Sequence, residues 1–264
     1  MDWLEALILG IVQGLTEFLP VSSSGHLLLG KEILGINTEA GGTTFEVVVH
    51  AATVLSTIFV FRKDLALLLG GFFKFKYNDE TQYLLKIAVS MIPVMIVGFF
   101  FKDTVKLLFG QGPLLIGCML LVTASLLLLT HFKKSGTRKI GYRDAFIIGL
   151  AQAVAVFPGL SRSGSTISTG LLLGNDKSEV ARFSFLMVLI PILGEAFLEL
   201  IGGEFSPAAS NIPTTSLIIG FLAAFIAGLF ACKVMISIVK RMKLYWFALY
   251  CGIVGVIAII YSLV

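Results

Sequence analysis

The sequence predicts an all-α polytopic membrane protein built as an inverted-topology repeat, with six transmembrane helices and two re-entrant helical hairpins. Three observations lead to this fold class. The 264 residues are 57% hydrophobic and only 14% charged, whereas about a quarter of the residues of a soluble domain are charged. Long apolar segments recur along the whole chain, and two serine-rich segments resemble each other at a constant spacing.

The repeat becomes visible when GIVQGLTEFLPVSSSGH (10–26) is aligned with GLAQAVAVFPGLSRSGS (149–165). Adding 139 to the positions of the first segment brings six identical residues into register without a gap. The first copy alone carries Glu17 and His26, and the second copy alone carries Arg162. The two copies therefore contribute different chemistry to whatever site they share.

Six segments are long and apolar enough to cross a bilayer core of about 30 Å, which requires roughly 20 residues per helix. They are 44–61, 84–101, 113–132, 181–201, 214–236 and 244–263.

The two motif segments, 1–36 and 144–174, do not meet this requirement, because short apolar arms flank a polar centre in each. We expect each to dip into the membrane as a helix–turn–helix and return, with protein or water satisfying the polar backbone of the turn. The membrane domain then divides into repeat 1 (1–132) and repeat 2 (133–264), each a hairpin followed by three spans.

Lysine and arginine are concentrated in the loops after the first, third and fifth spans. The positive-inside rule places these loops in the cytoplasm and both termini outside. The first hairpin then enters from outside and the second from the cytoplasm, so that their polar turns meet near the membrane midplane. The net charge of +4 is too small and too scattered to indicate a nucleic-acid partner.

The first polar turn combines a carboxylate, hydroxyls and an imidazole. Gln13 and Glu17 are four residues apart and share a helical face. Ser22, Ser23 and Ser24 stand where the helix restarts, and the free N–H groups there favour an anion. His26 follows Ser23 by three residues, so a hydroxyl and an imidazole can serve one substrate.

The second polar turn adds a guanidinium. Ser161, Arg162 and Ser163 open another half-helix, with Thr166 one turn behind Arg162. An arginine fork and hydroxyls at a helix N-terminus suit phosphate oxygens. Serines at a helix start are also common as plain caps, whereas ionisable groups inside a membrane are by default functional. The combined set predicts phosphoryl transfer from an anionic lipid.

Other polar residues have simpler interpretations. Glu46 and His50, four apart in the first span, are expected to pair with each other. Arg182 and Glu195 are expected to form a structural ion pair or to line an entry path, and His131 to anchor the chain at the interface.

Three motifs, LTEFLPVSSSGH (15–26), FEVVVH (45–50) and PGLSRSGST (158–166), resemble those of the undecaprenyl-diphosphate phosphatases of the BacA/UppP family. The resemblance covers the whole chain. It implies hydrolysis of the C55 isoprenyl diphosphate to its monophosphate at the outer face of the bacterial plasma membrane, a role in cell-wall synthesis and a link to bacitracin resistance. The family pattern allows Glu or Gln at the position of Gln13, and the glutamine weakens any scheme in which two carboxylates hold a metal.

We therefore expect Ser23 to attack phosphorus with Glu17 as base, Arg162 to neutralise the phosphate, and His26 to protonate the leaving group or activate water. A phosphohistidine at His26 is the alternative. The expected substrate-binding residues are Gln13, Ser22, Ser24, Ser161, Ser163 and Thr166.

Mg²⁺ or Ca²⁺ is expected to shield the diphosphate, with Glu17 as the only candidate protein ligand, and no organic cofactor is expected. The expected partners are the isoprenyl diphosphate and membrane lipid, and a homodimer is an open possibility. An isoprenyl-phosphate transporter or flippase is the alternative function, because inverted repeats with broken helices are a transporter architecture.

Overall fold

The computed structural model describes residues 1–36, 44–133, 136–194, 212–241 and 244–263. Within these ranges the secondary structure is α-helical, and the β-type pairing consists of two isolated bridges near residues 136–138 and 175–176. The all-α fold class is therefore confirmed.

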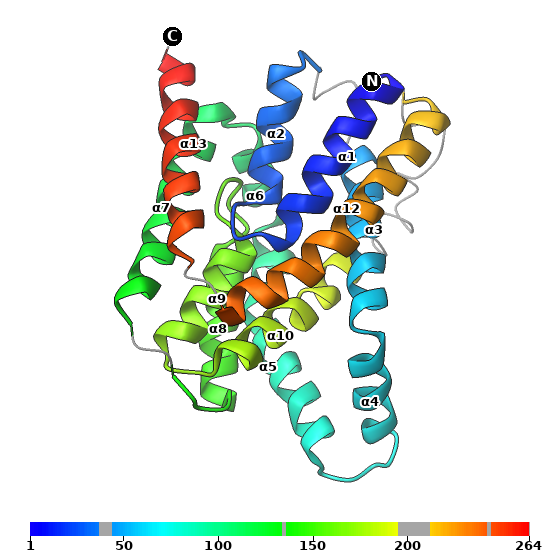
Figure 1. The fold of residues 1–264 in the computed structure, drawn as a ribbon, viewed down its shortest axis with the longest axis vertical. Helices are drawn as coiled ribbons and strands as arrows, with labels where there is room; N and C mark the ends of the chain where they lie inside the picture. The colour runs from blue at the N-terminus through cyan, green and yellow to red at the C-terminus, as the bar shows by residue number, and fades with distance from the viewer. Residues whose placement is uncertain (37–43, 134–135, 195–211, 242–243, 264) are drawn as a thin grey trace.

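Figure 1 shows how the described helices are arranged, and their buried apolar side chains form one large and one smaller cluster. In chain order they are α1 (Trp3–Phe18), α2 (Ser23–Ile33), α3 (Thr44–Val60), α4 (Arg62–Phe72), α5 (Asp79–Phe100), α6 (Lys102–Phe109), α7 (Gly112–Phe132), α8 (Tyr142–Val154), α9 (Arg162–Leu172), α10 (Lys177–Met187), α12 (Thr214–Arg241) and α13 (Tyr245–Leu263).

Four of the described helices, α5, α7, α12 and α13, are long and apolar enough to cross a membrane. The α3 and α4 helices together form a fifth candidate, bent by 74° at the break between them. These five correspond to five of the six expected spans, and they confirm a multi-pass membrane protein. The remaining expected span, 181–201, begins inside α10 and continues into 195–211, which lie outside the described residues.

Both motif segments form two helices separated by a short break. The first break follows α1, and α2 restarts behind Ser22, which has a positive φ of 71°. In Figure 1, α1 runs away from the N-terminus and α2 returns towards the same end of the molecule. The second break contains Gly159 with φ of 92°, where a Cβ would lie 2.5 Å from the Ile116 carbonyl oxygen. Glycine is therefore required for both the conformation and the close approach.

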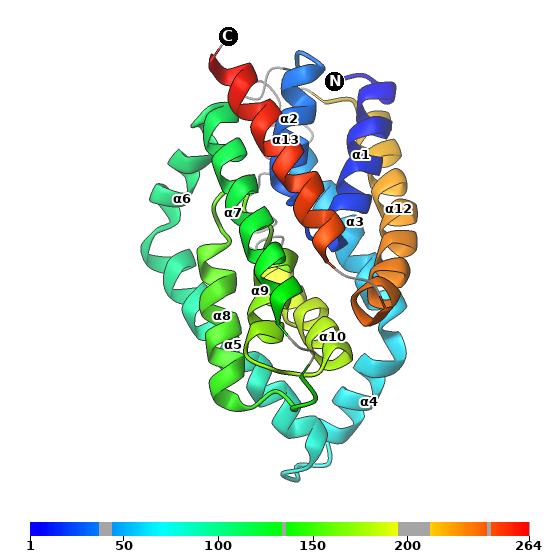
Figure 2. The same cartoon turned by 60° about the vertical axis from the view of Figure 1, so that its left-hand side comes forward.

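The first helix of each motif packs against a helix from the other half of the chain. The α1 helix contacts α12, α8 contacts α5, and α7 lies alongside α13 (Figure 2). Small residues allow these approaches: a Cβ on Gly10 would meet the Gly220 carbonyl at 2.5 Å, and a Cβ on Gly149 would meet the Ser90 carbonyl at 2.2 Å. The two serine-rich turns are thereby brought to the same place.

Candidate active site

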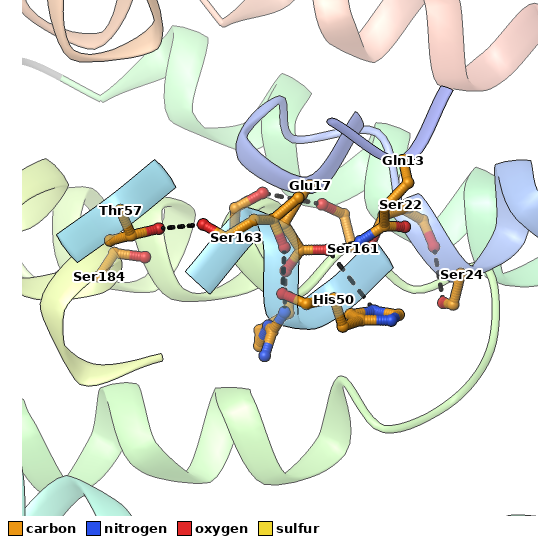
Figure 3. Close-up of polar contacts among 12 residues, drawn as sticks. Gln13, Glu17, Ser22, Ser24, His50, Thr57, Ser161, Ser163 and Ser184 are labelled. Atoms are coloured by element: carbon orange, nitrogen blue, oxygen red, sulfur yellow. Dashed lines mark hydrogen bonds and ion pairs between the residues drawn. The ribbon is translucent and has the colours of Figure 1, made fainter. Parts of the chain in front are cut away.

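The Glu17 carboxylate is the centre of the polar contacts drawn in Figure 3. Its Oε2 accepts hydrogen bonds from Gln13 Nε2 at 2.8 Å and from Ser23 Oγ at 2.6 Å. Its Oε1 accepts a charge-assisted hydrogen bond from Arg162. The side chain is only 5% exposed, so these partners replace the water that a buried carboxylate would otherwise require. The structure thus brings together Gln13, Glu17, Ser23 and Arg162, as the sequence predicts.

The two turns use the same local structure to present these side chains. Ser23 is the first residue of α2 and Arg162 is the first residue of α9. The preceding serine caps each helix: Ser22 Oγ accepts from the Gly25 N–H at 3.3 Å, and Ser161 Oγ accepts from the Gly164 N–H at 3.0 Å. Both reactive side chains therefore stand at helix N-termini, where the backbone favours negative charge.

The remaining expected hydroxyls hold the turns in place. Ser163 Oγ donates to the Leu19 carbonyl at 3.0 Å and so links the second turn to the first. Ser24 lies 3.5 Å from Ser22 Oγ, and Thr166 bonds the Arg162 carbonyl at 2.9 Å as well as Ser184. These residues lie around the site, and their hydroxyls bond to backbone carbonyls and to other hydroxyls of the turns and the neighbouring helix.

His26 lies on the same helix as Ser23 but bonds elsewhere. Its Nδ1 is 2.8 Å from the Ser22 carbonyl oxygen, and its Nε2 is 2.7 Å from the Tyr250 hydroxyl, with the two rings stacked. Both ring nitrogens are therefore engaged away from the Glu17 carboxylate. The contact with Tyr250 was not predicted, because 224 residues separate the two positions.

His50 corrects one expectation. It was expected to pair with the Glu46 carboxylate, but that carboxylate pairs with Lys31 Nζ at 2.5 Å. His50 Nδ1 bonds the Glu46 backbone carbonyl at 2.7 Å, and its Nε2 lies 3.7 Å from Glu17 Oε2. Its position at the end of the FEVVVH motif was the only sequence signal that could have placed it in the site.

Arg182 pairs with Asp64 at 2.7 Å, which joins α10 to α4. The partner expected from the sequence, Glu195, lies outside the described residues, so that pairing stays a prediction.

A small recess opens beside the carboxylate. Glu17, Arg162 and Ser163 line its polar part, and Phe185 and Leu189 belong to an apolar part that continues along α10 and the residues after it. A cavity that changes from polar to apolar suits a ligand with a charged head and an apolar tail.

The family model described as "Bacitracin resistance protein BacA" matches residues 6–257. The chain belongs to the BacA family. A relative from Bacteroides fragilis named undecaprenyl-diphosphatase is 57% identical over 266 residues, covering 99% of each chain. A relative of the same name from Parabacteroides distasonis is 57% identical and covers 98% of each chain, and one from Methanosphaera stadtmanae is 37% identical and covers 100% of this chain and 99% of its own.

The residues of this BacA-family site fit a protein-bound metal poorly. In the described part of the chain, no group of three or more His, Cys, Asp or Glu side chains is placed to hold a metal ion. Both oxygens of Glu17 already accept hydrogen bonds, and one of them faces the Arg162 guanidinium. Positive charge is thus already supplied to the carboxylate by a side chain.

Proposed function

We propose that this protein hydrolyses undecaprenyl diphosphate to undecaprenyl phosphate and inorganic phosphate, and thereby recycles the lipid carrier of bacterial cell-wall synthesis. The names of the full-length relatives support the substrate and the reaction. The observation that carries the mechanism is the Ser23 hydroxyl, which donates to Glu17 at 2.6 Å beside the Arg162 guanidinium. A nucleophile, its base and a phosphate-binding cation stand together.

Substrate binding requires Arg162 to change partner. In the structure the guanidinium pairs with Glu17. A diphosphate carries more charge and can accept two parallel hydrogen bonds, so it competes for the guanidinium. Arg162 then neutralises the phosphoryl oxygens, with the N–H groups of the α2 and α9 N-termini and nearby hydroxyls adding donors. The exchange frees one oxygen of Glu17.

The reaction proceeds in two steps. Ser23 Oγ attacks the terminal phosphorus while Glu17 takes its proton, and the P–O bond to undecaprenyl phosphate breaks. Glu17 then releases this proton to solvent. Water attacks the phosphoserine while Glu17 takes a proton from it and passes that proton to Ser23 Oγ, as the bond between phosphorus and serine breaks and inorganic phosphate leaves. His26, once its Nε2 leaves the Tyr250 hydroxyl, supplies a proton to the leaving oxygen or helps to activate the water. A phosphohistidine at His26 is the alternative, and the position of a trapped phosphoryl group separates the two.

We further propose that any Mg²⁺ or Ca²⁺ is carried by the diphosphate and is not held by the protein, since Glu17 is already engaged. The isoprenyl tail lies in the apolar part of the recess, beside Phe185 and Leu189. The protein acts without an organic cofactor.

The proposed membrane layout has six spans and two re-entrant hairpins in repeats 1–132 and 133–264. Both termini lie outside, and the site opens to the outer face of the bacterial plasma membrane. The reciprocal packing of α1 on α12 and of α8 on α5 supports this inverted arrangement, as does the near contact of Gly117 with Gly255, whose positions differ by about the repeat offset. A homodimer stays a prediction that the mass of the purified protein would test.

Phosphate release from undecaprenyl diphosphate by the purified protein in detergent tests the function. We expect stoichiometric release by the wild type and loss of at least a hundredfold in kcat for Ser23→Ala, because the nucleophile is absent. Ser125→Ala is the matched control, since among the described residues Ser125 bonds its own helix, at the Leu121 carbonyl. Binding of the lipid without any release would instead favour the transporter that the broken helices and inverted packing also suit.

A further inference from the structure

His50 belongs to α3 and reaches the Glu17 carboxylate from the side opposite to the two serine-rich turns. Its Nδ1 lies 2.7 Å from the Glu46 carbonyl oxygen, and because a carbonyl oxygen only accepts, Nδ1 carries a proton. This bond sets the orientation of the ring. The other nitrogen, Nε2, then faces Glu17 Oε2 at 3.7 Å.

The neighbours of His50 leave Glu17 as its acidic partner. The Glu46 carboxylate, one helical turn away, is held by Lys31 Nζ from α2 at 2.5 Å. That bond also fastens the start of α3, and with it the carbonyl that orients the ring. The Arg162 guanidinium, which also contacts Glu17, occupies Oε1, whereas His50 faces Oε2. The two side chains therefore approach different oxygens of one carboxylate.

We infer that His50 is a positioning residue that keeps Glu17 aimed at Ser23 when the diphosphate draws Arg162 away. The inference rests on the proposed function, in which Arg162 exchanges Glu17 for phosphate. After that exchange, Oε1 has lost its donor, and in the described part of the chain Gln13 and His50 are the remaining side chains outside the nucleophile that face the carboxylate. In the imidazolium form of His50, Nε2 carries a proton as well as Nδ1. That second N–H is the donor that restrains the rotation of the base and compensates its charge during proton transfer.

Three substitutions at His50 separate this role from simple packing. In His50→Gln an amide N–H donor replaces Nε2 at similar reach, in His50→Asn the donor is one bond too short, and His50→Leu has no donor. We expect kcat for phosphate release to fall about tenfold to a hundredfold in His50→Leu and His50→Asn, with KM within threefold. His50→Gln should recover most of the wild-type kcat.

The matched control is His131→Leu, because His131 lies at the end of α7 against Phe132 and Tyr245, away from the site. Its kcat should equal that of the wild type. Thermal unfolding in detergent shows whether each variant folds. If His50→Leu does not fold, the polar variant His50→Asn takes its place in the comparison.

Unchanged kcat in His50→Leu or His50→Asn would overturn the inference, as would an equal loss in His50→Gln or a loss confined to KM. These outcomes are distinct from failure of the proposed function, in which the wild-type protein itself would release no phosphate from the lipid.

Discussion

Glu17 takes its character from the donors around its carboxylate. Gln13 and Ser23 donate to one oxygen, and Arg162 donates to the other. A buried carboxylate with that many donors stays ionised and fixed in direction, which a base for the serine hydroxyl requires. The cost is a weaker base, and release of Arg162 to the diphosphate restores part of its basicity.

The residue at position 13 determines whether the site depends on a divalent cation. Gln13 is fully buried, and its Nε2 donates to Glu17 at 2.8 Å. In Gln13→Glu a second carboxylate would face the first, and two like charges at that distance favour a shared proton or a bound cation. We expect phosphate release by Gln13→Glu to fall at least tenfold without divalent ions and to recover with Mg²⁺ or Ca²⁺.

Assays across a series of EDTA and Mg²⁺ concentrations check this prediction. Gln13→Leu is the control, since it removes the donor without adding charge and should show no gain from metal. An equal gain from Mg²⁺ in Gln13→Glu and Gln13→Leu would contradict the prediction, because the added carboxylate would then play no part in binding the cation.

At the scale of the elements, glycines decide how closely the helices pack. A Cβ on Gly149 in α8 would lie 2.2 Å from the Ser90 carbonyl oxygen of α5. Gly149→Ala should therefore force the two helices apart and cost about 1–3 kcal/mol, the usual range for overpacking. The expected observation is a clearly lower Tm in detergent.

Gly98→Ala, also in α5, is the control, because a Cβ there meets nothing within 4 Å. Its Tm should be equal to or above that of the wild type, given the better helix propensity of alanine. Equal Tm values for Gly149→Ala and Gly98→Ala would show that α5 and α8 pack less closely than described.

The start of α8 depends on Asp144. Burial by itself would raise the pKa of Asp144, but hydrogen bonds from Asn175 and the Gly141 N–H, together with the Arg138 guanidinium, outweigh it and hold the pKa below its ordinary value. A lowered folded-state pKa means that the contribution of Asp144 to stability is fully present above the unfolded-state value of about 3.9. It is lost as the pH falls from there through the folded-state pKa.

We therefore expect Asp144→Asn to destabilise the protein by about 1–3 kcal/mol at pH 7, and the difference from wild type to shrink as the pH approaches 3. Unfolding in detergent over a pH series measures this. Asp79→Asn, at the exposed start of α5, should change stability only slightly. A difference that stays constant down to pH 3 would mean that the charge of Asp144 contributes nothing.

At the scale of the whole molecule, the central question is the side of the membrane from which each hairpin enters. Ile33, the last residue of α2, is 80% exposed, and Phe75, between α4 and α5, is 87% exposed. In a variant with Cys118, Cys232 and Cys251 replaced, an impermeant thiol reagent applied to cells with a permeabilised outer membrane should label Ile33→Cys but not Phe75→Cys.

Both cysteines should react once the plasma membrane is disrupted, which controls for reactivity. The reverse pattern would place the termini in the cytoplasm. Labelling of both cysteines while the plasma membrane is still closed would put Ile33 and Phe75 on the same side and would contradict the proposed inverted repeat.

The sequence by itself determined the all-α fold class, the membrane character, the family and the positions of both helix breaks. The length and apolar composition of the segments indicate the all-α fold class and the membrane character, because a bilayer admits backbone only where its polar groups are satisfied. The sequence motifs indicate the family. The meeting of Glu17 with Arg162 was also predictable, since a repeat with two complementary copies suggests one shared site.

Only the tertiary structure decided which imidazole faces the carboxylate. Local spacing favoured His26, which follows Ser23 on the same helix, and it paired His50 with Glu46. In the packed structure His26 instead contacts Tyr250 on α13, and Glu46 forms an ion pair with Lys31. His50 therefore faces Glu17. Contacts between helices that lie far apart in the chain depend on how whole surfaces fit together, and residue spacing within one helix carries no information about that fit.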